Sequence, residues 1–315
     1  MSLPQFPHFT LFEAGPGVYA ALAGDTGACI SNTAIVDLGD RTLILDTFQT
    51  VQAAEDLRAA AMALTGRSAD LTVISHWHGD HYGGSQVFDD APILSTARTC
   101  EIIAGKDPGN LDAYIAGLDS ALEQARAALE TSTDPVAREH AEGTVKTVSL
   151  LREAAPGFRF TGPSPMDGDG MTFEGSDRRV EIMSLGRGHT ESDLFVRVPD
   201  AGVVVTGDLL WVGRHPRVND GFPAAWVDVL GQIEGLGART LVSGHGGIGG
   251  AADVHYLRGY LRAIDEIVDE AVLTGLDDDA LTRIPVPPGS ETWGDLARFR
   301  GSISALVARR REGSR

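Results

Sequence analysis

A short segment of the sequence alternates histidine and aspartate, with the letters HWHGDH at residues 76–81. His76, His78 and Asp80 are spaced two residues apart, so in an extended turn their side chains point to one side, while His81 points to another. Imidazole nitrogens and carboxylate oxygens are donors that zinc and related cations use, so this one loop could serve two adjacent ions. The loop follows the continuously apolar run Leu71–Ser75, which is typical of a buried strand whose carboxyl end opens on a crevice.

Three further histidine or aspartate residues follow apolar runs in the same way, each beside glycine. They are His189, Asp208 and His245, and the runs before them are Val180–Leu185, Val203–Thr206 and Leu241–Ser243. Glycine lets the backbone turn tightly and brings such side chains to a shared rim. Taken alone, each would be more typical of a turn residue than of a metal ligand. Beside the first motif, the three favour a common site.

The elements that must position these residues are short β-branched strands separated by glycine-rich turns. The further predicted strands are Gly17–Leu22, Ser31–Leu38, Thr42–Asp46, Met171–Phe173 and Leu194–Val198. Helical periodicity is predicted for Ala53–Leu64 and for the segment around Trp226 and Ile233. Two runs of strands, each followed by helices, indicate an α/β fold with two sheets between helical layers.

Residues 107–155 form a separate pattern, which predicts an inserted helical hairpin. The apolar seam of its first helix steps by three or four residues and consists of Leu111, Ile115, Leu118, Leu122, Ala125 and Leu129. Asp134-Pro135 ends this helix, and a second helix follows. The hairpin could pack on the core, cover a cleft as a lid, or form the contact of a homodimer. Two amphipathic helices, Asp253–Thr274 and Thr292–Arg311, are predicted within the C-terminal segment 253–315.

Composition excludes several classes of partner. Among 315 residues, 44 acidic side chains outnumber 26 basic ones, and the formal net charge is −18. Nucleic acids and anionic membranes bind basic surfaces, so neither is expected as a partner, and a small-molecule substrate is favoured. The two cysteines, Cys29 and Cys100, predict no disulfide framework. No basic residue precedes Arg41 and no apolar run approaches 18 residues, so the expected compartment is the cytoplasm.

Together these motifs resemble the successive metal-binding motifs of the metallo-β-lactamase-fold hydrolases, over residues 17 to about 250. The resemblance implies one domain over residues 1–315, built as a four-layer αββα sandwich with a dinuclear site at one edge of the sheets. It implies that the first metal is held by His76, His78 and His189, and the second by Asp80, His81 and His245. Asp208 would bridge the two metals.

The residue at the bridging position separates branches of this family. Lactamases that share the first motif commonly carry a cysteine where this chain has Asp208, and a lysine where it has Trp211. The chain therefore resembles the lactonase and thioesterase branches more closely, and a β-lactamase is the lesser alternative. An oxygen bridge suits two zinc ions per chain, with iron or manganese as alternatives.

The expected activity is zinc-dependent hydrolysis of an ester, lactone, thioester or similar acyl bond by a hydroxide held between the metals. Asp80 is the candidate proton carrier, and Trp211 and His215 are candidate substrate contacts. Asp46 is either an acceptor for the second N–H of a ligand histidine or a turn-capping residue. The alternative reaction class is that of the persulfide dioxygenases, which hold one iron with two histidines and an aspartate. A nuclease and a non-catalytic scaffold are disfavoured by the charge and by the complete ligand set.

Overall fold

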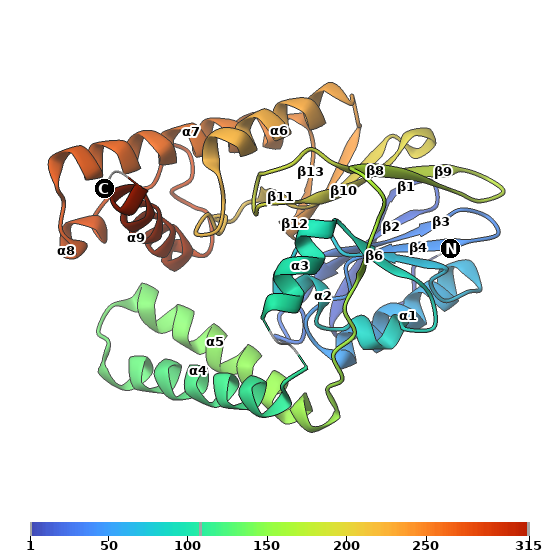
Figure 1. The fold of residues 1–315 in the computed structure, drawn as a ribbon, viewed down its shortest axis with the longest axis horizontal. Helices are drawn as coiled ribbons and strands as arrows, with labels where there is room; N and C mark the ends of the chain where they lie inside the picture. The colour runs from blue at the N-terminus through green and yellow to red at the C-terminus, as the bar shows by residue number, and fades with distance from the viewer. Residues whose placement is uncertain (1, 107–108, 314–315) are drawn as a thin grey trace.

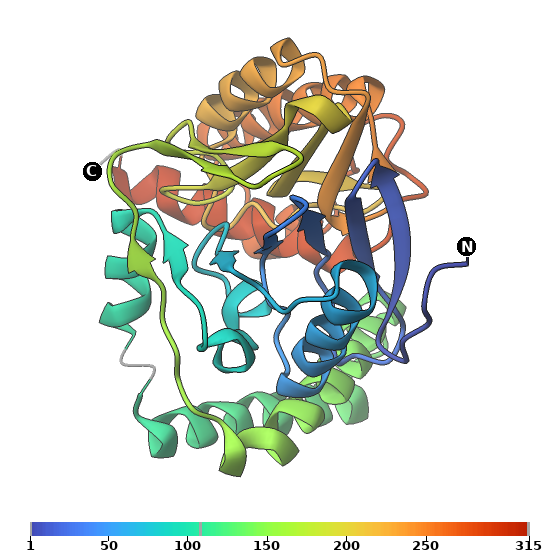
Figure 2. The same ribbon diagram turned by 90° about the vertical axis from the view of Figure 1, so that its right-hand side faces the viewer.

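The computed structural model describes residues 2–106 and 109–313, and two β-sheets stacked face to face form its centre. Helices cover the outer face of each sheet, so the layers run helix, sheet, sheet, helix (Figure 1 and Figure 2). This arrangement confirms the predicted αββα sandwich. The predicted domain limits at residues 1 and 315, and the predicted start of the helical hairpin at residue 107, lie outside the described residues.

The first sheet contains seven strands in sequence order. They are β1 (Phe9–Gly15), β2 (Val18–Ala23), β3 (Thr33–Asp37), β4 (Thr42–Leu45), β5 (Leu71–Val73), β6 (Ile93–Ser95) and β7 (Ser164–Pro165). The first four pair antiparallel, whereas β4 to β7 pair parallel. Helix α1 (Val51–Thr65) connects β4 to β5; the Thr50 side chain caps its first turn and Gly66, with φ of 75°, ends it. The sequence did not predict β1 or β6, because β1 lacks a regular alternation and β6 is very short.

The second sheet has the strand order β13-β12-β11-β10-β9-β8. Its strands are β8 (Gly170–Glu174), β9 (Arg179–Ser184), β10 (Leu194–Val198), β11 (Val203–Val212), β12 (Thr240–Gly246) and β13 (Ile248–Gly249). Only β11 and β12 pair parallel, and helix α6 (Pro223–Gly235) makes the crossover between them. Strands β11 and β12 both run past their predicted ends, so Asp208 and His245 lie within strands. The β11 register shifts around Gly207, where φ is 52°, and this irregularity turns Asp208 toward the edge.

The hydrophobic core consists of three layers of apolar contacts. Between the sheets pack residues such as Val36, Leu43, Val73, Ile182, Val196 and Val205. Helix α1 covers the first sheet through Leu57, and helices α6, α7 (Ala251–Thr274) and α9 (Leu296–Gly313) cover the second through Trp226, Leu257 and Phe299. The remaining short helices are α2 (Gly79–Tyr82), α3 (Ala97–Gly105) and α8 (Asp278–Leu281). Among the described residues, no helix combines the length and apolarity needed to cross a membrane.

The predicted hairpin is present as α4 (Leu111–Thr131) and α5 (Pro135–Ala154), which lie side by side below the sheets in Figure 1. Asp134 caps α5 by accepting a hydrogen bond from the Val136 backbone. Leu118, Leu122 and Ala125 of the predicted seam are buried. The large hydrophobic side chains exposed among the described residues lie elsewhere. A homodimer through this hairpin therefore stays a prediction.

Candidate metal centre

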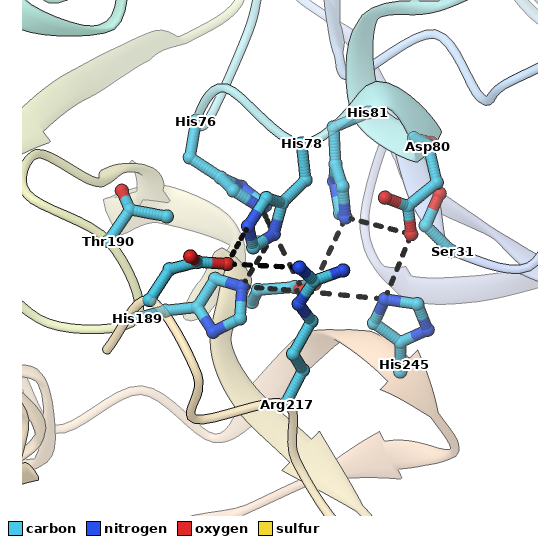
Figure 3. Close-up of polar contacts among 12 residues, drawn as sticks. Ser31, His76, His78, Asp80, His81, His189, Thr190, Arg217 and His245 are labelled. Carbon is cyan, nitrogen blue, oxygen red and sulfur yellow. Dashed lines mark hydrogen bonds and ion pairs between the residues drawn. The ribbon is translucent and has the colours of Figure 1, made fainter. Parts of the chain in front are cut away.

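The seven predicted ligands lie together at one edge of the two sheets, although 169 positions separate the first from the last. Four of them come from the loop after β5 and from α2, and the others from the β9–β10 loop, β11 and β12. Figure 3 shows the histidine side chains pointing toward one another from these elements. The donor atoms form two groups, the first of His76, His78, His189 and Asp208, the second of Asp80, His81 and His245. The family resemblance implies the same grouping of the other six residues and assigns Asp208 to both groups as a bridge.

The first group brings nitrogen atoms unusually close. His78 Nδ1 lies 3.0 Å from His76 Nε2 and 2.9 Å from His189 Nε2, and His189 Nε2 lies 3.1 Å from Asp208 Oδ2. Burial holds the pKa of His76 well below its usual value and lowers the pKa of His78 to about 4. Both rings are therefore neutral at pH 7, and their lone pairs can be offered to a cation.

The second group adjoins the first through Asp208. His245 Nε2 lies 3.3 Å from Asp80 Oδ2 and 3.4 Å from Asp208 Oδ2, while His81 Nε2 lies 3.1 Å from Asp208 Oδ1. Among the described residues, His81 Nε2 and Asp208 Oδ1 are buried without a well-formed hydrogen bond. Buried polar atoms left in this state are costly in a folded protein, so these two atoms fit the role of ligands to a cation.

The charges of this group also suit a cation. Burial raises the pKa of Asp208, but the positive charges of His245, His81 and His189 outweigh it and hold that pKa well below its usual value. Burial lowers the pKa of His81 and His245, yet the neighbouring carboxylates outweigh it and the net pKa of both is raised. A cation that binds here must therefore displace protons from these two imidazoles.

Two aspartates hold the outward nitrogens of ligand histidines. Asp46 Oδ2 lies 2.7 Å from His81 Nδ1, and the same carboxylate accepts hydrogen bonds from the Ser75 backbone and hydroxyl. This contact is the one expected of Asp46 as an acceptor for a candidate ligand histidine. Asp220 Oδ2 lies 3.1 Å from His78 Nε2, and this residue was missed from sequence because no motif surrounds it. The hydrogen bond with His78, together with Arg217, lowers the pKa of Asp220 to about 2.

The structure corrects both predicted substrate contacts. Trp211 is 1% exposed, and its ring stacks on His245 with centroids 3.8 Å apart, so it packs behind a candidate ligand. His215 is equally buried, and its Nδ1 lies 2.9 Å from the Tyr260 hydroxyl under the C-terminal helices. The sequence placed both residues in a loop. In fact, β11 continues through Trp211, and the following turn directs His215 into the core. Figure 3 instead places Arg217 in front of the two groups.

Gly84, which follows the first motif, has no Cβ, and its backbone can therefore lie close to Thr47 and Ala54. A Cβ at this position would overlap the Thr47 carbonyl oxygen and the Ala54 side chain. We therefore expect Gly84→Ala to destabilise the fold by about 1–3 kcal/mol and to weaken metal binding, because the loop must move. Thermal unfolding and metal content would measure both effects. Gly105→Ala is the matched control, since its Cβ would meet nothing within 4 Å. Equal behaviour of the two variants would contradict this explanation.

A match to a known protein family covers the residues of this site. Residues 26–245 match the family model described as the metallo-beta-lactamase superfamily. The chain belongs to the metallo-beta-lactamase superfamily. Members of this superfamily are generally hydrolases. The family match spans all seven candidate ligands, and it ends at His245.

Two curated proteins match short stretches of this chain. The lactamase-like protein ptaB of Pestalotiopsis fici is 37% identical over 75 residues, covering 23% of this chain and 24% of that protein. The atrochrysone carboxyl ACP thioesterase of Emericella nidulans is 36% identical over 72 residues, covering 23% of each protein. The chain thus matches less than a quarter of the length of these curated relatives.

Solved structures of similar fold include a metallo-beta-lactamase from Pontibacter korlensis, with a TM-score of 0.58 and 15% identity over 81% of this chain and 99% of that chain. The DIM-1 metallo-beta-lactamase gives a TM-score of 0.58 and 15% identity over 82% of this chain and 98% of that chain. At this identity the likeness establishes the fold alone.

Proposed function

We propose that this superfamily member uses two cations to hydrolyse an ester, lactone, thioester or similar acyl bond of a small molecule. The observation that carries the proposal is the position of Asp208. Its carboxylate oxygens lie within 3.4 Å of His81, His189 and His245, which belong to the two separate donor groups. One carboxylate shared by two groups suits a pair of cations better than a single ion. Zinc binds imidazole nitrogens and carboxylate oxygens of this kind, and iron and manganese bind them as well.

Proton transfer in this reaction is assigned to a residue of the chain. When bound, a pair of cations supplies hydroxide at neutral pH and polarises the acyl carbonyl. Asp80 has the most exposed side chain of the seven ligands, at 19%, so it is the ligand carboxylate most accessible to solvent. In the proposed reaction, Asp80 would take the remaining proton of the hydroxide that has added to the acyl carbon. It then returns that proton to the departing oxygen or sulfur, which completes hydrolysis.

Several features support acyl hydrolysis over the competing activities. The short match to a protein named as a thioesterase makes thioesters the first substrates to test. Asp208 and Trp211 stand where the related lactamases carry cysteine and lysine, which disfavours β-lactams. Seven donors exceed the two histidines and one aspartate of a mononuclear iron oxidoreductase. The net charge of −18 favours a small molecule over a nucleic acid.

Metal counting combined with a substrate screen tests this function. We expect the purified chain to hold two metal equivalents and to cleave thioesters, lactones or esters faster than nitrocefin or phosphodiesters. A chelator is expected to abolish cleavage and added zinc to restore it, because the two cations supply the attacking hydroxide. Treatment with the zinc-saturated chelator is the control. One iron per chain with oxygen consumption would contradict the proposal, as would preferential cleavage of nitrocefin.

A further inference from the structure

The loop of residues 213–222, which connects β11 to α6, touches the first donor group at two places. Asp220 Oδ2 lies 3.1 Å from His78 Nε2. The Phe222 backbone donates a hydrogen bond of 2.9 Å to the carbonyl oxygen of Gly188, the residue that precedes another ligand histidine. The β11–α6 loop therefore supports two of the three histidines that form the first donor group.

Ser302 of helix α9 is a polar residue within an apolar stripe. It is 1% exposed and lies between Phe299 and Leu306, three and four residues away on the same face of the helix. Its hydroxyl accepts a hydrogen bond from the Val218 backbone at 3.0 Å and donates one to Asn219 Oδ1 at 2.9 Å. A buried hydroxyl needs such partners, and both of these belong to the β11–α6 loop.

Arg309 of the same helix contacts the loop on the other side of Asp220. Its guanidinium donates a hydrogen bond to the Gly221 carbonyl oxygen and lies 5.2 Å from the centre of the Phe222 ring. Together with Ser302, this arginine holds the backbone immediately before and after Asp220. The Asp220 carboxylate is therefore kept against its ligand histidine from both sides of the chain.

Helix α9 is itself fixed by the hydrophobic core. Ile303 and Val307 are at most 1% exposed and pack in the same apolar cluster as Leu257 of α7. A close-packed cluster of this kind deforms little, so the helix is a firm support for the loop. Helix α9 lies beyond residues 26–245, which match the superfamily model. The support is thus an addition to the segment that carries the metal-binding motifs.

We infer that Ser302 and Arg309 are positioning residues for the first cation, because they hold Asp220 against His78 through the β11–α6 loop. This inference rests on the two-cation site of the proposed function. Asp220 accepts the proton on His78 Nε2 and so leaves Nδ1 unprotonated, facing the other donors. When the loop loosens, water replaces the carboxylate and the two tautomers mix. Part of the His78 population then carries its proton on the nitrogen that must bind the metal.

Two arginines of α9 provide a matched pair of variants for zinc titration against a competing chelator. Arg309 donates to the Gly221 carbonyl oxygen of the loop, whereas Arg311 donates to the Leu276 carbonyl oxygen after α7, at 2.7 Å. Arg309→Ala is expected to weaken the first zinc by about 3–10-fold, less than outright loss of a ligand's outer partner, and to leave the second within about twofold. Arg311→Ala is expected to leave both zinc affinities unchanged.

A double-variant cycle tests whether Ser302 acts through Asp220. Ser302→Ala is expected to weaken the first zinc as Arg309→Ala does. In an Asp220→Ala background, which lacks the carboxylate, Ser302→Ala is expected to cause no further weakening. Ser290→Ala is the control, since Ser290 is also buried but donates to the nearby Pro287 carbonyl oxygen. Thermal unfolding establishes that the variants fold, and Arg309→Ala completes the cycle if Ser302→Ala does not fold.

Nitrogen NMR of the His78 imidazole in the chelator-treated protein gives a readout that needs neither metal nor catalysis. The wild-type protein and Arg311→Ala are expected to show one tautomer, protonated on Nε2. Ser302→Ala and Arg309→Ala are expected to show a mixture of the two. If α9 served only to stabilise the fold, these variants would unfold at a lower temperature without any change of tautomer.

The outcomes separate this inference from the proposed function. Equal zinc affinities of Arg309→Ala and Arg311→Ala would overturn the inference, as would an effect of Ser302→Ala that persists in full without Asp220. If the protein binds two zinc ions with the expected differences but cleaves no acyl substrate, the proposed function fails and the inference stands. If it binds no zinc, the proposed function fails, and the tautomers decide whether α9 positions His78.

Discussion

His78→Ala is expected to lower kcat by at least about a thousandfold, which corresponds to about 4 kcal/mol of transition-state stabilisation. His78 Nδ1 lies within 3.0 Å of both His76 Nε2 and His189 Nε2, so it completes the first donor group. Without it, this group offers two histidines and the shared Asp208. We expect the variant to hold one metal equivalent in place of two, and loss of a cation removes several kcal/mol of charge stabilisation.

Three measurements separate this effect from unfolding. Elemental analysis gives the metal content, steady-state kinetics give kcat, and thermal unfolding reports stability. The fold is expected to persist, because the apolar layers between and outside the sheets do not include His78. His255→Ala is the control, since that histidine is exposed on α7, away from the centre. A folded His78→Ala protein that retains two metals and full activity would show that the predicted ligand set is wrong.

The seven candidate ligands could be predicted because their signals are local. Each follows a short apolar run of the sequence, and polar residues that follow such runs are often brought together at one edge of a sheet. The helical hairpin was predictable for a similar reason, since a regular apolar seam needs no knowledge of tertiary contacts. Asp46 could be proposed as a supporting residue because it ends the predicted strand Thr42–Asp46.

Other features depend on contacts between distant parts of the chain. Asp220 lies in the loop after β11, and that loop is held by Ser302 of α9, whose hydroxyl bonds to the Val218 backbone and to the Asn219 side chain. A sequence pattern carries no information about that contact. His215 was misplaced as a substrate contact because its Tyr260 partner lies 45 residues away.

The two supporting aspartates allow the two metal sites to be weakened separately. At Asp46, replacement by asparagine keeps the shape of the side chain and tolerates the local φ of 66°. The new amide nitrogen can donate to His81 Nδ1, which moves the ring proton to Nε2, the atom that faces Asp208. A protonated nitrogen cannot bind a metal. We therefore expect Asp46→Asn to weaken the second cation by about 10–100-fold, the usual cost of losing such an outer partner.

Asp220→Asn is expected to act on the first cation through the same tautomer change, because Asp220 contacts His78 Nε2 while Nδ1 faces the other donors. Its effect is expected to be smaller, since the Asp220 side chain is 29% exposed and water can replace its contact, whereas that of Asp46 is 1% exposed. Titration with a competing chelator resolves the two affinities, and nitrogen NMR of the imidazoles reports the tautomers. If both variants weakened the same site, or neither changed a tautomer, the division of the centre into two separately supported halves would be wrong.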